Sequence, residues 1–319
     1  MKTGDSRSMS YSNISKFAAF VIAFAAVASG CTSKARGSHP AVENAVYAEP
    51  RVVGRIANPD IIEASGLAAS KCQPGVFWTH NDSGDGPYIY ALNERGDNLG
   101  TWRVSGARNI DWEDIATFKD AAGKCYVYTG DIGDNKLQRE THTIYRVPEP
   151  AVTAASAGTT GTTAAQTEPA EALEYTYPDG GQNAETMLVH PVTGDIYVLS
   201  KSRDKPSGVY RLPAGFGGSG VRAAKVAELK VPAIPFGLLT GGDVAPDGRS
   251  VVVCDYAGGY ELRLPEGDKI FDDIWSQKPV EIDLGKRDTG EAVAYSADGT
   301  SILATTENQK APIIKLQRK

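Results

Sequence analysis

The chain lacks the short motifs that identify the common enzyme classes. No nucleophile elbow, zinc-protease helix motif or Walker loop is present. Its four cysteines match no zinc-site spacing, and no acidic stretch has the full length of an EF-hand loop. The net charge is −6, and no block of Lys and Arg follows the N-terminal segment. We therefore expect no nucleic-acid binding and cannot assign catalytic residues from motifs.

No hydrophobic run near the N-terminus is long enough to cross a bilayer, because the apolar stretch Phe17–Ser29 has only 13 residues. Basic residues precede it, which is typical of a signal peptide over residues 1–30. The run ends in Ala28-Ser29-Gly30-Cys31, which resembles the bacterial lipobox and implies cleavage before Cys31 and lipid attachment to its thiol. An ordinary secretory peptide is the alternative. Residues 31–48 are small and polar, as in a flexible tether, so we expect an extracytoplasmic protein that contacts the membrane only through its lipid.

A short motif with a small or acidic start and an apolar finish recurs five times. Its copies begin at residues 65, 113, 185, 242 and 291, so the starts lie 48, 72, 57 and 49 residues apart. Periods of about 40 to 50 residues with several short strands in each are typical of a β-propeller. The copies are Ser65–Ala68, Glu113–Ala116, Glu185–Leu188, Gly242–Ala245 and Glu291–Ala294.

Each repeat divides into short runs rich in Val, Ile, Tyr and Thr, which predicts four strands in a blade. The fifth repeat lacks its outermost strand, and Arg51–Ile56 can supply it and remove the free edge. We therefore predict an all-β, five-bladed β-propeller over residues 49–319, closed by an N-terminal strand. A six-bladed ring with a further blade in Val221–Phe236 is the alternative. Ala151–Ala172 consists mainly of Ala, Thr and Gly and is predicted to be a disordered loop.

The first column of the repeat predicts a metal site on the propeller axis. Inner strands surround that axis, so Glu113, Glu185 and Glu291 should converge, and uncompensated carboxylates raise each other's pKa. Calcium accepts 6 to 8 oxygen ligands and resolves such repulsion. We predict calcium bound by these three glutamates and Ser65, with Glu63 and Asp111 close by. Glutamates that face solvent or pair with arginine are the alternative.

A second polar set follows the second strands, at one end of the axial channel. Such loops commonly form the ligand site of a propeller, although tight turns also select Asn, Asp and Gly. Within the set, His80 and Lys201 are the groups suited to acid–base chemistry. The predicted ligand-binding face comprises His80, Asn81, Asp82, Asp85, Asp114, Asp131, Asp134, Lys201, Asp243, Asp255 and Glu307.

The cysteines fit an oxidising compartment. Cys72 and Cys125 occupy the same kind of hairpin in neighbouring repeats, so we predict a disulfide between them. Cys254 follows three valines and is expected to be a buried free thiol. We expect a monomer.

Several motifs resemble those of an uncharacterised family of exported bacterial β-propeller proteins. They are Glu63–Ser70, Trp78–Asp85, Asp111–Ala116 and Gly130–Asn135, and the resemblance covers nearly the whole mature chain except Ala151–Ala172. The architecture is also similar to that of five-bladed calcium-dependent apyrases, which implies an axial calcium held by Ser and Glu at the blade starts. Gly242 stands where that resemblance would place a further Ser, and the other apyrase motifs are missing.

Two functions follow from these observations. One is a calcium-containing module that binds a polar small molecule or a protein at one face of the ring. The other is a calcium-dependent hydrolase of phosphate esters or anhydrides, in which His80, Asp82, Asp131 or Lys201 positions a water molecule. Because no acid–base pair is identifiable from spacing, the sequence favours binding.

Overall fold

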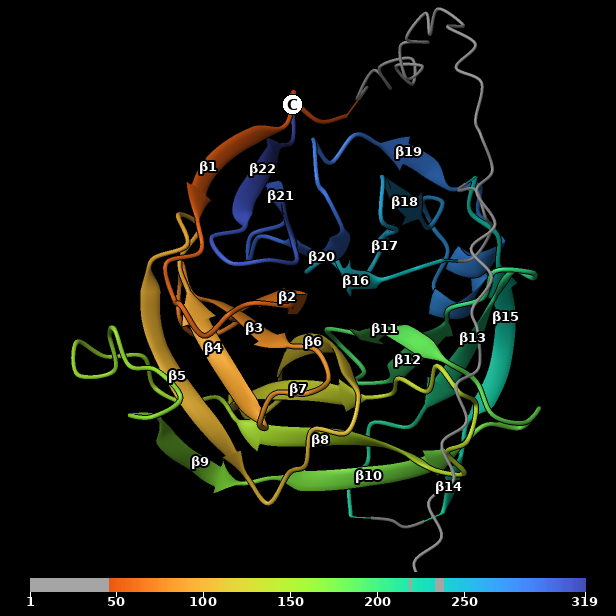
Figure 1. Cartoon of the computed structure of the whole chain (residues 1–319). Coiled ribbons are helices and arrows are strands. Elements are labelled where there is room, and N and C mark those ends of the chain that lie inside the picture. The colour runs from red at the N-terminus through yellow and green to blue at the C-terminus, as the bar shows by residue number, and fades with distance from the viewer. Residues whose placement is uncertain (1–45, 218–219, 233–237) are drawn as a thin grey trace, which may run out of the picture. The chain divides into compact units, whose positions relative to one another are not determined.

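The computed structural model describes residues 46–217, 220–232 and 238–319, and these residues form five β-sheets arranged around an axis (Figure 1). The 3-10 helix η1 (Phe271–Ser276) is the one helical segment among them. Within the described ranges, no helix has the length and apolar character needed to cross a membrane. The predicted signal peptide, Cys31 and most of the tether lie outside the described residues. The five-bladed β-propeller is confirmed.

The blades are numbered 1 to 5 in the chain order of their inner strands, and the strands of each blade are listed outwards from the axis. The inner strands are β2 (Ala64–Ala69), β6 (Trp112–Lys119), β11 (Ala184–Val189), β16 (Gly241–Val244) and β20 (Gly290–Tyr295). The second strands are β3 (Phe77–Asn81), β7 (Cys125–Asp131), β12 (Ile196–Ser200), β17 (Ser250–Cys254) and β21 (Ser301–Thr306). The third strands are β4 (Tyr88–Leu92), β8 (His142–Pro148), β13 (Ser207–Leu212), β18 (Gly259–Arg263) and β22 (Pro312–Gln317). The fourth strands are β5 (Asn98–Ser105), β10 (Glu171–Thr176), β15 (Ala224–Leu229), β19 (Val280–Ile282) and β1 (Arg51–Arg55).

The N-terminal strand closes the ring as predicted. β1 pairs antiparallel with β22, with Arg55 opposite Pro312. The same strand end is joined to blade 1, because Arg55 N–H donates to the Arg95 carbonyl at 3.1 Å and Ala57 N–H donates to the Gly96 carbonyl at 2.8 Å. β1 therefore acts as a clasp that belongs to the last blade and is hydrogen-bonded to the first.

The alternative of six blades is wrong. Its expected location divides between two existing sheets, since β14 (Val221–Arg222) joins the edge of blade 2 and β15 is the fourth strand of blade 3. Part of that location, residues 233–237, lies outside the described residues. Five sheets leave no unpaired set of strands among the described residues from which a further blade could form.

The segment Ala151–Ala172 differs from the expected disordered loop. It contains β9 (Ala165–Pro169), which pairs parallel with β5 and extends blade 1 to five strands. Hydroxyl groups fasten the segment to the blade, because Ser156 Oγ donates to the Leu99 carbonyl and Thr159 Oγ1 accepts from Thr101 N–H, both at 2.8 Å. Hydrogen bonds to a sheet edge thus order a segment that has little apolar area. Its amino-acid composition gives no indication of these bonds.

The hydrophobic core consists of five clusters, one between each pair of neighbouring blades. Because successive side chains of a strand point to opposite faces of the sheet, one strand contributes residues to two clusters. In β17, Val251 and Val253 pack with residues of blade 3, whereas Val252 and Cys254 pack with residues of blade 5. The free thiol of Cys254 is fully buried there, and burial raises its pKa to about 11. Because every blade packs against a neighbour on both faces, second strands such as β12 and β17 are buried along their whole length.

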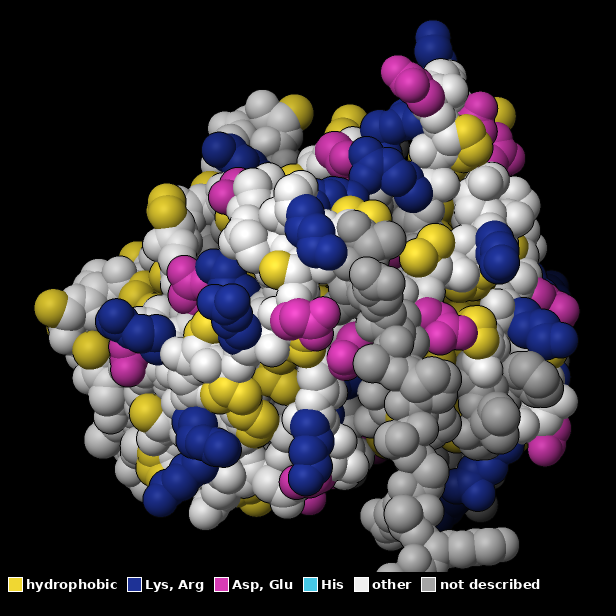
Figure 2. All heavy atoms as spheres, turned by 90° about the horizontal axis from the view of Figure 1, so that it is seen from above, with side chains coloured by type: hydrophobic (Ala, Val, Ile, Leu, Met, Phe, Trp, Pro, Cys, Tyr) yellow, Lys and Arg dark blue, Asp and Glu magenta, His cyan; other side chains and the backbone are white. Residues whose placement is uncertain are grey.

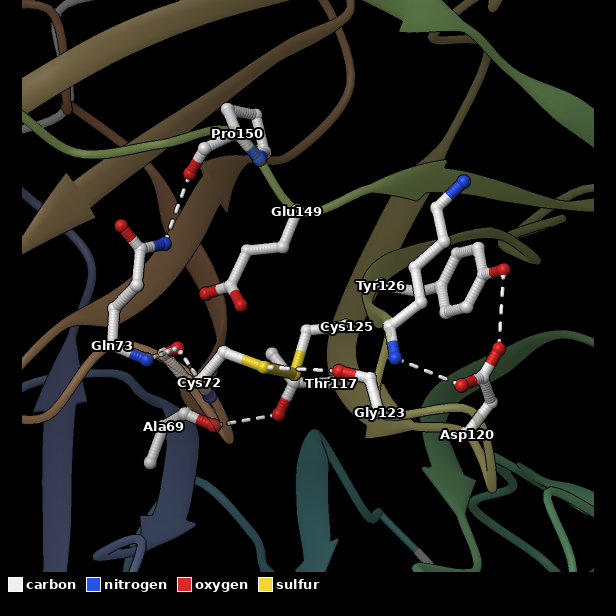
Figure 3. The surroundings of a disulfide bond; sticks show 12 residues. Ala69, Cys72, Gln73, Thr117, Asp120, Gly123, Cys125, Tyr126, Glu149 and Pro150 are labelled. Atoms are coloured by element: carbon white, nitrogen blue, oxygen red, sulfur yellow. Dashed lines mark hydrogen bonds between the residues drawn. A yellow bond between two sulfur atoms is a disulfide. The ribbon is translucent and has the colours of Figure 1, made fainter.

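Cys72 and Cys125 form a disulfide in the structure, with their Cα atoms 6.2 Å apart (Figure 3). Cys72 lies in the turn between β2 and β3, and Cys125 begins β7, so the bond joins blade 1 to blade 2. This is the pairing that the sequence predicted.

On the rim that carries β1, β19 and β22, Lys and Arg side chains are interspersed with Asp and Glu (Figure 2).

Candidate metal centre at the axial mouth

The two ends of the axial channel differ in the chain segments that they present. All inner strands begin at one face of the ring, where the second strands end, and we call it the mouth face. The hairpins between inner and second strands lie at the opposite face, which we call the turn face. The predicted metal ligands and the predicted ligand-binding loops all belong to segments at or near the mouth face.

A β-bulge places each of the three predicted glutamates. In blade 2 the pairing passes from Trp112 to Asp114 and leaves Glu113 without a cross-strand partner. Glu185 in blade 3 and Glu291 in blade 5 are omitted from their ladders in the same way. Blade 4 has no such irregularity at its start, and there Gly242 takes the equivalent position. Bulges commonly redirect a side chain next to functional sites, and here they free these three glutamates from the regular alternation of the strand.

The three glutamates are buried and influence one another. Glu113, Glu185 and Glu291 are 4%, 5% and 6% exposed. Burial, followed by the repulsion of Glu185, Asp82 and Asp111, raises the pKa of Glu113 well above its ordinary value. Burial and Glu185 raise the pKa of Glu291 to about 9. No described residue donates a hydrogen bond to the carboxylate of Glu113 or Glu291, and the attraction of Lys201 lowers their pKa values only in part.

Two of the four predicted calcium ligands have partners within the protein. The Lys201 ammonium forms an ion pair with Glu185 and hydrogen-bonds the Tyr256 hydroxyl at 2.5 Å. Burial lowers the pKa of Lys201, but Glu185 and Tyr256 outweigh burial and raise it. Ser65 Oγ donates to the Glu113 backbone carbonyl at 2.6 Å and thereby links blades 1 and 2. The ring of Ser65 and three glutamates is therefore only partly available to an ion.

The structure brings Glu113 together with two aspartates instead. One carboxylate oxygen from each of Asp82, Asp111 and Glu113 lies within 4.8 Å of the others. Burial raises the pKa of Asp82 and, together with Asp82, that of Asp111. Gly133 faces this cluster, since a Cβ built on it would lie 2.2 Å from Glu113 Oε1 and 2.4 Å from Asp111 Oδ2. Only glycine leaves room for the two carboxylates in these positions.

Most other residues of the predicted ligand-binding face stabilise turns. Asn81 Oδ1 accepts from two backbone amides, and its Nδ2 donates to Asp85 at 2.8 Å. Asp134 accepts from Gln138 and Arg139 amides, and Asp255 accepts from Ala257 and Gly258 amides. Asp131 is buried and paired with Arg139 at 2.8 Å.

Asp114 and Asp243 join neighbouring blades rather than facing the mouth. Asp114 accepts from the Met187 amide of blade 3 at 2.8 Å, and Asp243 accepts from the Tyr295 amide of blade 5 at 2.9 Å. His80 is fully buried against Trp112, and burial lowers its pKa to about 4. Its imidazole is therefore neutral near pH 7 and shielded from any ligand. Glu307 remains at the mouth, where burial and Asp82 raise its pKa.

Sequence reasoning placed Asp111 near the site but missed the roles of Gly133 and Tyr256. Asp111 lies two residues before Glu113, and the Asp-Trp-Glu spacing was its only signal. Gly133 follows β7, and nothing in the pattern distinguishes it from the other turn glycines. The mouth-face loops also expose four large apolar side chains: Ile62, Ile110, Leu137 and Tyr256 are 46%, 58%, 58% and 37% exposed.

Comparison with known proteins adds no identity to this geometry. The chain matches no protein-family model, and no curated protein matches it.

Proposed function

We propose that the protein is a calcium-binding propeller whose acidic mouth captures a polar ligand or a protein. The observation that supports this most strongly is the Glu113 carboxylate, which is 4% exposed and receives no hydrogen bond from any described residue. It lies beside the half-buried carboxylates of Asp82 and Asp111, and the attraction of Lys201 only partly offsets the burial and repulsion that raise its pKa. A bound ion would remove that cost.

Calcium suits the composition of the cluster. Asp82, Asp111 and Glu113 offer only carboxylate oxygens, which favour hard cations over zinc or copper. Three carboxylates supply fewer ligands than the 6 to 8 oxygens that calcium accepts, unless all bind through both oxygens. Positions would remain for water or for an oxygen atom of a ligand. The exposed apolar side chains on the surrounding loops would contribute further contacts.

Binding has more support than hydrolysis. A hydrolase of phosphate esters needs a group that positions or deprotonates water near the ion. His80 is buried, Asp131 is paired with Arg139, and Lys201 is held by Glu185 and Tyr256. Among the described acid–base groups at the mouth, those without such a partner are carboxyl groups: the acids of the proposed ion site, Glu63, Glu291 and Glu307.

The proposal is tested by calorimetric titration of the chelator-treated protein with calcium. We expect one site per chain, loss of binding in Glu113→Gln, and retention in Glu307→Gln, which changes a mouth carboxylate outside the cluster of three. Calcium binding that is equal in both variants would contradict the assignment. A panel of phosphate esters and nucleotides in calcium buffer then separates the two functions, because turnover that is lost in Asp111→Asn would establish the hydrolase instead.

We also propose that the protein is exported and held at the membrane through lipid on Cys31. The diacylated cysteine gives stable attachment, since each buried methylene contributes about 0.8 kcal/mol. Wild type should fractionate with membranes and Cys31→Ala with soluble proteins. Recovery of the wild type in the soluble fraction, with an N-terminus other than Cys31, would replace the anchor by simple secretion.

A further inference from the structure

A second group of metal-ligating side chains lies on the turn face, at the disulfide between blades 1 and 2. Glu149, which directly follows β8, lies beside Cys72 and Cys125. Both Sγ atoms and a Glu149 carboxylate oxygen lie within 4.8 Å of one another. The carboxylate of Glu149 points toward Cys72 (Figure 3).

One oxygen of Glu149 is fixed, and the other has no partner. Oε1 accepts from Trp78 Nε1–H at 2.7 Å, and the Glu149 backbone amide donates to the Cys125 carbonyl at 2.8 Å. Oε2 is buried and has no hydrogen-bond partner. A buried carboxylate oxygen without a donor is costly, and this one lies beside two sulfur atoms. The disulfide offers it no positive charge, whereas a cation at the same place would.

We propose that reduction of the disulfide turns Cys72, Cys125 and Glu149 into a binding site for a thiophilic divalent cation such as zinc. A dithiol reductant supplies two electrons and two protons, the sulfur–sulfur bond breaks, and the reductant leaves as its own disulfide. Zinc then displaces the two thiol protons. Two thiolates and one carboxylate bind the ion, and water completes a tetrahedral set.

Several features of the structure suit this exchange. Cys72 is exposed, so a reductant and a metal can reach the sulfur atoms from solvent. Trp78 orients Glu149, and such outer partners typically change metal affinity by about 10- to 100-fold. The three ligands come from the turn after β2, the start of β7 and the end of β8, which explains why no cysteine spacing indicates a zinc site. The site lies on the face opposite the calcium mouth and does not depend on it.

The experiment adds cobalt(II) to the reduced full-length protein and records thiolate-to-metal charge-transfer absorption, followed by displacement with zinc. We expect one cobalt per chain in the reduced wild type and none at this site in the oxidised protein. Glu149→Gln keeps an acceptor for Trp78 and should bind at least about tenfold more weakly. Asp120→Asn, a nearby carboxylate outside the site, should bind like wild type.

Two controls keep the result decisive. The double variant Cys72→Ser/Cys125→Ser measures absorption from Cys31 and Cys254, and equal absorption in that variant would overturn the proposal. Circular dichroism of the reduced protein must retain its sheet signal, because unfolding on reduction would also overturn it. Unchanged affinity in Glu149→Gln would show that the thiolates bind alone and that the carboxylate is not a ligand.

Discussion

Glu113→Gln should change the melting temperature in opposite directions with and without calcium. In chelator the variant should melt higher than wild type, because the amide replaces a buried carboxyl group that Glu185, Asp82 and Asp111 repel. Relief of about 2 kcal/mol corresponds to roughly 4–8 °C. At calcium one hundred times the dissociation constant, wild type gains about 2.7 kcal/mol and the variant gains none. Differential scanning calorimetry should therefore show that the order of the two proteins reverses.

Gly133→Ala provides the matched variant that keeps every proposed ligand. Its methyl group occupies the space of Glu113 Oε1 and Asp111 Oδ2 and displaces both carboxylates. Because these are ends of flexible side chains, the melting temperature in chelator should change little, while most of the calcium-dependent rise is lost. A full calcium response in Gly133→Ala would place the ion elsewhere in the mouth.

Gly54→Ala should open the clasp and produce the largest loss of stability of any single methyl addition that we propose. A Cβ at residue 54 would lie 1.9 Å from the Arg95 carbonyl oxygen, a backbone atom, so β1 or the turn of blade 1 must move. Overpacking typically costs about 1–3 kcal/mol, and a clash with backbone, which cannot rotate away, should lie near 3 kcal/mol. For a domain of this size the melting temperature should fall by roughly 6–12 °C.

Gly215→Ala is the control for this prediction, since nothing lies within 4 Å of a Cβ at that position. Thermal melts of the two variants compare the same added methyl group at a position where it meets backbone and at a position where it has space. If Gly54→Ala melts within a degree or so of Gly215→Ala, β1 does not hold the ring shut.

The sequence predicted the features that depend on the period of the repeat and on the pairing of strands and cysteines. Blade starts such as Glu113 and Glu291 recur at intervals of 48 to 72 residues, and an unpaired N-terminal strand together with an incomplete last repeat indicates closure. Cys72 and Cys125 occupy equivalent hairpins in neighbouring repeats, which places them near each other once the blades are adjacent.

The sequence could not predict the geometry of the mouth. The bulges that redirect Glu113, Glu185 and Glu291 leave no mark in an alternating pattern, because the extra residue is itself part of the motif. The pairing of Glu185 with Lys201 depends on where two loops of the same blade meet. β9 was missed because hydroxyl and backbone hydrogen bonds, rather than apolar area, hold that segment to β5.

The position of the clasp also determines which side of the ring a tether reaches. β1 runs antiparallel to β22, so its first residues lie beside the end of β22 on the turn face, where Ala48 N–H donates to the Gln317 carbonyl at 2.8 Å and Tyr47 bridges to Arg318. A lipid on Cys31 would therefore pull on the face that carries the disulfide. The acidic mouth lies at the other end of the channel from residues 46–48, so a partner bound there would not meet the entry point of the N-terminal segment.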